Sequence, residues 1–261
     1  GAIREAANRM FSLGQIDSLC LMGTSKSVPT AMLHEEGETE SFQPDRPFWS
    51  VETDLLYVES NLVIHELPST ESNDPSNFLQ RINSQVIEGG IIPLGRIPSD
   101  DLSFWQHYFE SIESYTPAPI ACVAISNYPP NWVVETRATL SEGKNSGCMS
   151  QTLYTLGALD DDDLDADILN DEPVTFAEGS RIIVNLHGGL PQNGEPTQEL
   201  TTDHPNYSLQ LTSFSSFPKA ILYLFSCYGG NSGWWKPGGV IPHFLSNGGI
   251  AAIASSSVSF V

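Results

Sequence analysis

Arg181-Ile182-Ile183-Val184-Asn185-Leu186 runs directly into His187-Gly188-Gly189, and Ala220-Ile221-Leu222-Tyr223-Leu224-Phe225-Ser226 runs into Cys227-Tyr228-Gly229-Gly230. Each stretch is a short apolar run, rich in β-branched or aromatic residues, that stops at glycines, which is typical of a strand. Continuous apolar runs suit strands of a parallel sheet that is covered on both faces. We therefore expect two parallel strands whose carboxyl ends deliver His187 and Cys227 to one edge of a sheet.

Strands and helices alternate along the rest of the chain. This order predicts an α/β fold with a mostly parallel sheet and helices on both faces. We expect an N-terminal α/β subdomain over residues 1–126 and a catalytic subdomain over residues 127–261. Helices are predicted at 4–13, 100–115, 168–179 and before 248, strands at 18–23, 120–125, 151–156 and 250–253, and loop at 127–147.

The helix predicted after residue 100 has an apolar face that can be read from its spacing. Leu102, Trp105, Phe109 and Ile112 recur at helical intervals, and Ser99 stands where an N-cap is expected. We expect this face to pack on the core.

The charge balance limits the partners of this protein. The 261 residues carry 11 Lys and Arg against 32 Asp and Glu, a net charge of −21. Such a balance argues against nucleic acid and anionic membranes as partners. No run approaches the roughly 18 consecutive apolar residues of a membrane span, so no span is expected.

An acidic run, Asp160–Asp167, raises the question of a metal ion. An EF-hand loop that began at Asp163 would need Gly and Glu where Ile168 and Val174 stand, so that motif fails. The run suits an acidic helix start better. We name no metal-ligating residue and require no cofactor, while structural Ca²⁺ stays an open alternative.

The four cysteines, Cys20, Cys122, Cys148 and Cys227, are widely spaced. Cys20 and Cys122 lie in apolar runs, as buried free thiols do. Four cysteines are too few for a disulfide scaffold in a chain of this length, and their number does not decide the redox compartment.

A histidine and a cysteine at neighbouring strand ends are the minimum set for thiol catalysis. We expect Cys227 to be the nucleophile and His187 the general base and acid. The N–H groups of Gly188 and Cys227 would form the oxyanion hole, and Trp234 and Trp235 would wall a substrate pocket. His204 and His243 are rival partners for the thiol.

Several segments together resemble one family, the gingipain-like cysteine peptidases (family C25 of the caspase-like clan CD). These segments are Asp17–Gly23, Thr53–Tyr57, Gly95–Pro98 with the helix that ends at Tyr115, Ile183–Gly188, Leu224–Cys227 and Phe244–Ser257. His187 and Cys227 match the family's catalytic positions. The chain departs from the family at Leu186, where glycine is frequent, and at Ser226, where alanine is common.

The resemblance implies a caspase-like sheet whose first and last strands are missing from this chain, and therefore a partner in the remaining parts of a longer or processed protein. It also implies a polypeptide substrate, cleavage after a basic residue, and an extracellular or cell-envelope location. No pocket carboxylate is identified, although Asp203 and Glu142 lie in candidate loops. The alternatives are a cytoplasmic caspase-clan protease that a partner activates, and a degenerate fold that binds or scaffolds.

Overall fold

The computed structural model describes most of the chain. The described residues are 2–24, 27–28, 31–35, 49–53, 64–66, 80–82, 94–116, 120–145, 147–157, 167–168, 174–188, 199–203, 207–211, 214–226 and 239–254. The chain divides into two compact units, Gly1–Asp100 and Asp101–Val261. Each is described below by itself.

In its described residues the first unit carries one helix and two small sheets. Its elements are α1 (Ala2–Ser12), β1 (Leu19–Met22), β2 (Ala31–Glu35), β3 (Trp49–Thr53), β4 (Ile64–Glu66), β5 (Gln80–Ile82) and β6 (Leu94–Ile97). β1 and β6 pair in parallel, and the other four strands form a sheet in the order β3-β2-β5-β4. The helix predicted at 4–13 and the strand predicted at 18–23 are confirmed by α1 and β1.

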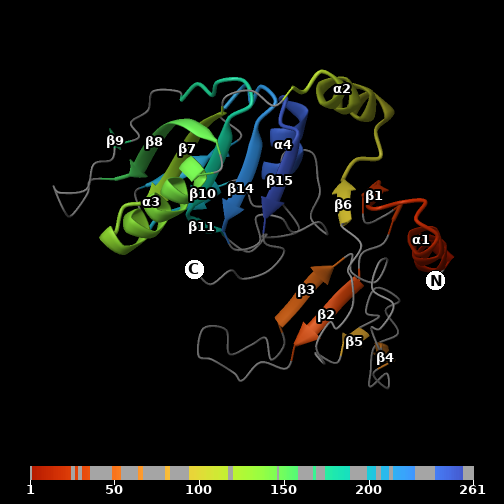
Figure 1. Ribbon diagram of the computed structural model, residues 1–261. Coiled ribbons are helices and arrows are strands. Elements are labelled where there is room, and N and C mark those ends of the chain that lie inside the picture. Colours follow the sequence, from red (N-terminus) through yellow and green to blue (C-terminus); the bar gives the residue numbers. More distant parts are fainter. Residues whose placement is uncertain are drawn as a thin grey trace. The chain divides into compact units, whose positions relative to one another are not determined.

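The second unit is built on a parallel sheet. Its elements are α2 (Leu102–Glu113), β7 (Ile120–Asn127), α3 (Pro130–Asn145), β8 (Cys148–Leu156), β9 (Asp167–Ile168), β10 (Arg181–Asn185), β11 (His187–Gly188), β12 (Glu199–Thr201), β13 (Ser208–Gln210), β14 (Ile221–Phe225), α4 (Val240–Ser246) and β15 (Ala251–Ala254). Six strands pair in parallel in the order β15-β14-β10-β7-β8-β9 (Figure 1). The predicted α/β class and mostly parallel sheet are confirmed.

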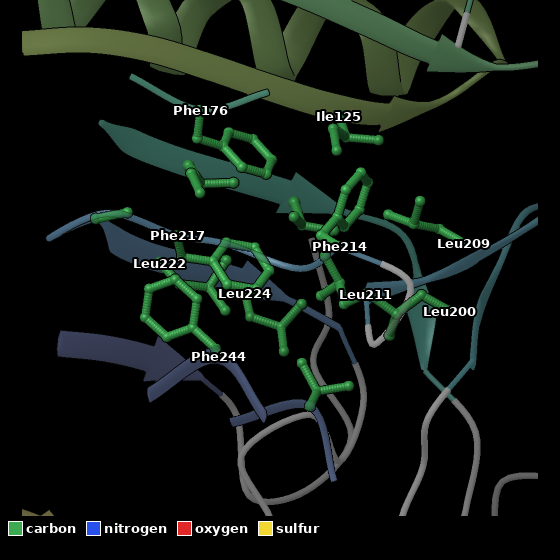
Figure 2. Packing of buried hydrophobic residues seen from close by; sticks show 14 of the residues in the cluster. Ile125, Phe176, Leu200, Leu209, Leu211, Phe214, Phe217, Leu222, Leu224 and Phe244 are labelled. Atoms are coloured by element: carbon green, nitrogen blue, oxygen red, sulfur yellow. The ribbon is translucent and has the colours of Figure 1, made fainter. Parts of the chain in front are cut away.

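Alternation along the strands gives the sheet two apolar faces, and helices cover both. On one face, Ala124 and Ile183 pack with Val133 and Leu140 of α3. On the other face, the side chains of β7, β10 and β14 pack with α4 and a group of phenylalanines (Figure 2). Because both faces are buried, the strands are continuously apolar, as expected of a parallel sheet.

The strand order places a topological switch point between β7 and β10. From β7 the chain builds outward through β8 and β9 on one side, and β10, β14 and β15 lie on the other side. In open α/β sheets, ligands bind at the carboxyl ends of the strands beside such a point. Asn127 ends β7, and His187 follows β10 at this rim.

Two boundaries differ from those read in the sequence. The units meet at residues 100 and 101 rather than at 126 and 127, because β7 is a central strand of the second unit's sheet. Residues 130–145 form α3 rather than a loop. Val133, Thr136 and Leu140 turn one buried side of this helix to the sheet.

Helix α2 faces the core with a different side from the one predicted. Phe104 and Tyr108 pack against the core cluster, whereas Leu102, Phe109 and Ile112 are exposed. The N-cap is not Ser99 but Asp101, whose carboxylate accepts hydrogen bonds from the N–H and hydroxyl of Ser103. These hydrogen bonds lower the pKa of Asp101.

Among the described residues of the stretch 168–179, where a helix is predicted, no helix is present. Asp167–Ile168 is strand β9, and residues 174–179 are irregular. A turn at Ala177–Ser180 leads into β10 instead, held by the N–H of Ser180 donating to the carbonyl of Ala177.

The expectation that Cys122 is a free thiol is wrong. Cys122 of β7 and Cys148 at the start of β8 are bonded to each other, with their Cα atoms 5.7 Å apart. Both are buried beneath α3. Cys20 is a free cysteine, and it is exposed rather than buried.

Gly249 is a site where an added methyl group should destabilise the fold. A Cβ there would overlap the ring of Phe244, which is fully buried in the core. We expect Gly249→Ala to lower the free energy of unfolding by about 1–3 kcal/mol, measured by urea denaturation. Gly95→Ala is the matched control because a Cβ at Gly95 meets open space. Equal stability of the two variants would contradict the packing.

Candidate functional site

The two strands that decide the fold are parallel neighbours, as predicted. Asn185 of β10 is in register with Phe225 of β14, and the N–H of Leu186 donates to the carbonyl of Phe225. Pairing therefore continues to the end of β10, directly before β11, which begins at His187. Figure 1 shows β10 and β14 side by side with β11 next to them. Cys227 comes next but one after Phe225 and lies outside the described residues. The chain thus leaves both strands at the same rim.

Of the other predicted site residues, Gly188 is described by the structure and two tryptophans are not. Gly188 is described, in the short strand β11, where it is opposite Leu200 of β12. Trp234 and Trp235 lie outside the described residues. The structure therefore brings His187 and Gly188 to the candidate site and leaves the thiol and the predicted pocket wall as sequence predictions.

A carboxylate binds the imidazole of His187. The distance from His187 Nε2 to Asp203 Oδ1 is 2.7 Å. Antiparallel pairing explains how they meet, because His187 is opposite Thr201, and Asp203 follows at the end of that strand. Both side chains are partly open to solvent, at 41% and 44% exposure, so the pair is accessible from outside the protein.

Asn127 anchors this carboxylate from the end of β7. Its Nδ2 donates to Asp203 Oδ2 at 2.9 Å, and its Oδ1 accepts from the Asp203 N–H at 3.3 Å. Asn127 is fully buried. The sheet core thus fixes the position of a carboxylate that belongs to a surface segment.

Trp132, in the first turn of α3, packs on the imidazole of His187. Its ring and that of His187 meet edge to face, with centroids 4.8 Å apart. An aromatic ring in this position restricts rotation of the imidazole. The stretch predicted as loop therefore supplies a helix that contributes to the site.

A layer of buried polar groups lies directly below the rim. Thr136 of α3 donates to Ser126 Oγ and accepts from Asn185 Nδ2, both at 3.1 Å. Asn185 Oδ1 and Ser226 Oγ are buried without a hydrogen-bond partner. Buried polar groups of this kind cost free energy unless they are satisfied. Asn185 ends β10 and Ser226 directly follows β14, so both atoms lie at the rim of the candidate site.

The rival histidines differ in what the structure shows of them. His243 of α4 donates from Nε2 to the carbonyl of Phe214 and packs against Phe217, so it belongs to the core packing. His204 lies outside the described residues.

Sequence reasoning missed Asn127 and Trp132, and considered Asp203 only as a pocket carboxylate. Asp203 cannot be read as a free carboxylate, because both of its oxygens are engaged. One signal was present in the sequence: Pro130 is the first residue of α3, a position that proline favours. That signal would have placed Trp132 on a helix beside the rim.

Within the described part of the chain, neither a candidate metal site nor a membrane-spanning helix is present. No group of three or more His, Cys, Asp or Glu residues there could hold a metal ion, and the acidic run 160–166 falls outside it. Nor does any helix in these ranges have the length and apolar character needed to cross a membrane.

Comparison of the chain with protein-family models, with curated proteins and with solved structures found no match. The resemblance to gingipain-like peptidases therefore stays a prediction from the motifs.

Proposed function

We propose that this protein is a gingipain-like cysteine endopeptidase with a caspase-like fold, in which Cys227 is the nucleophile and His187 the general base and acid. The observation that carries the proposal is the parallel pairing of β10 and β14, in register up to Asn185 and Phe225. His187 and Cys227 each stand two residues beyond that pair. A substrate bound across this rim would meet both side chains.

The proposed reaction has two steps. In acylation, the thiol proton passes to His187, and the sulfur of Cys227 attacks the carbonyl carbon of the peptide bond. The C–N bond then breaks, its electron pair leaves with the amine, and His187 returns the proton to that nitrogen. In deacylation, His187 takes a proton from water, whose oxygen displaces the thiolate from the thioester.

The negative oxygen that forms in both steps needs donors. The N–H groups of Gly188 and Cys227 are the proposed oxyanion hole, because Gly188 has no Cβ to keep a substrate away from its backbone. Gly188 is partly exposed beside His187, which supports this role. Trp234 and Trp235 are the proposed pocket wall, and a basic residue before the cleaved bond is the proposed preference.

Other parts of the proposal concern setting and partners. The Cys122–Cys148 disulfide supports an extracellular or cell-envelope location, because disulfides persist in oxidising compartments. The proposed partner is a polypeptide substrate, and the charge balance argues against nucleic acid. The chemistry needs no cofactor, and a structural Ca²⁺ ion at the acidic run stays an alternative.

Selective alkylation of Cys227 tests the proposal. We expect iodoacetamide at neutral pH to label Cys227 first, and His187→Ala to remove that preference. Cys122 and Cys148 are disulfide-bonded and do not react. Although the Cys20 residue is exposed, its sulfur is partly buried. This partial burial raises the pKa of the Cys20 thiol, despite the lowering effects of a hydrogen bond with the Ile97 backbone and of the Arg96 charge.

Because a raised pKa leaves less thiolate at neutral pH, Cys20 should react slowly there and faster as the pH rises. Mass spectrometry of the labelled peptides separates the two free thiols. Equal labelling of Cys20 and Cys227 at neutral pH, unchanged by His187→Ala, would contradict the enzyme and favour a binding or scaffolding module.

A further inference from the structure

The imidazole of His187 is held at one of its two nitrogens. Nε2 lies 2.7 Å from Asp203 Oδ1, and no hydrogen bond of Nδ1 is found among the described residues. An ionised carboxylate only accepts hydrogen bonds. Nε2 must therefore carry the hydrogen, and the lone pair of the neutral ring is at Nδ1.

The orientation of Asn127 makes this assignment firm. Its Oδ1 accepts from two backbone donors, the N–H of Tyr128 at 3.0 Å and the N–H of Asp203 at 3.3 Å. The amide cannot be turned around without losing both hydrogen bonds. Nδ2 therefore has to donate to Asp203 Oδ2, so that oxygen has to be an acceptor.

These three residues form a hydrogen-bond chain, Asn127–Asp203–His187, in which the orientation of each side chain determines that of the next. Backbone donors orient the Asn127 amide, the amide determines which oxygen of Asp203 accepts, and the remaining oxygen determines the tautomer of His187. Asn127 is fully buried at the end of β7, so the chain begins in the rigid sheet. Trp132 packs on the imidazole and restricts its rotation away from Asp203.

We propose that Asp203, oriented by Asn127, is a positioning residue that holds His187 as the Nε2–H tautomer, so that Nδ1 is the nitrogen that exchanges the proton with the Cys227 thiol. The inference rests on the proposed function for its role in catalysis. The hydrogen-bond chain itself exists without that function and can be measured independently.

Asp203→Asn gives a sharp expectation because the new side chain is isosteric. Asn127 Nδ2 still requires an acceptor, so the introduced amide must turn its oxygen toward Asn127. Its NH₂ group then faces His187 Nε2 and donates to it, which moves the ring hydrogen to Nδ1. We expect the variant to reverse the tautomer.

Nitrogen-15 NMR of labelled protein measures this directly, with the His187 signals assigned by their loss in His187→Ala. The neutral wild-type ring should show a protonated Nε2, and Asp203→Asn a protonated Nδ1. Glu135→Gln, at an exposed carboxylate of α3, is the matched control and should match the wild type. A wild-type ring protonated at Nδ1, or the same tautomer in wild type and Asp203→Asn, would overturn the proposal.

Kinetics then test the catalytic role. Asp203→Asn should lower kcat by about 10²–10⁴-fold with little change in KM, as expected when a base has the wrong tautomer, whereas Glu135→Gln should leave both unchanged. Unaltered kcat in a variant whose tautomer is reversed would overturn the positioning role. If the tautomer reverses as expected while Cys227 proves inert in the wild type, the chain Asn127–Asp203–His187 stands and the peptidase function fails.

Discussion

His187→Ala is expected to lower kcat/KM for peptide hydrolysis by about 10³-fold, and Cys227→Ala by at least as much. In the proposed reaction His187 takes the thiol proton and then protonates the leaving amine. The expected loss follows because general acid–base catalysis contributes roughly 10²–10⁴-fold. Cys227 is proposed to form the acyl-enzyme, and none of the described residues at the candidate site carries a free thiol that could replace it. A fluorogenic peptide library with Arg or Lys before the cleaved bond measures both effects.

The matched control is His107→Ala, because His107 is an exposed histidine of α2 with no role in the proposed site. Its kcat/KM should equal that of the wild type. Circular dichroism of each variant excludes loss of fold as the cause. Peptide cleavage that persists in both His187→Ala and Cys227→Ala would refute the dyad, whatever the residue before the cleaved bond.

The sheet and the rim that carries the candidate site could be predicted because a strand buried on both faces has a continuously apolar sequence. Ile182–Val184 and Leu222–Leu224 are continuously apolar, and glycines follow each stretch. Such runs indicate parallel strands, and parallel neighbours present their carboxyl ends at one rim. These rules act over short distances in the sequence, so they can be applied to one chain alone.

The rest of the candidate site could not be predicted because it depends on contacts between distant segments. Asn127 and Asp203 meet only after β7 takes its place next to β10 and β12 pairs with β11. No local pattern marks an asparagine at a strand end as the anchor of a carboxylate. The functional reading of Asp203 changed for the same reason: as a loop residue it resembled a free pocket carboxylate, yet both of its oxygens are bonded.

Helix α2 illustrates a different limit. The interval between Leu102, Phe109 and Ile112 is helical, and the helix is present, yet these side chains are exposed. Phe104 and Tyr108, on another side, pack on the core, and the Tyr108 hydroxyl donates to the carbonyl of Ile250 at 2.7 Å. When a helix has aromatic residues on several sides, tertiary contacts decide which side is buried. The periodicity of the sequence cannot decide between those sides.

Removal of the Cys122–Cys148 disulfide is expected to destabilise the second unit by about 3 kcal/mol. The bond closes a loop between residues separated by 26 positions, and cross-links of this size stabilise mainly by restricting the unfolded chain. For a unit of this size the corresponding fall in Tm is roughly 6–12 °C. Calorimetry of Cys122→Ala/Cys148→Ala against wild type refolded in a glutathione redox buffer measures it.

The reductant response distinguishes loss of the covalent bond from loss of packing, since both sulfurs are buried beneath α3. Reduction with dithiothreitol should lower the Tm of the wild type and leave that of Cys122→Ala/Cys148→Ala unchanged. Cys20→Ala is the matched control and should respond to reductant as the wild type does, because Cys20 is a free thiol of the first unit. If the unreduced, denatured wild type instead alkylates at all four cysteines, the disulfide is not formed, and the support it lends to an oxidising location is lost with it.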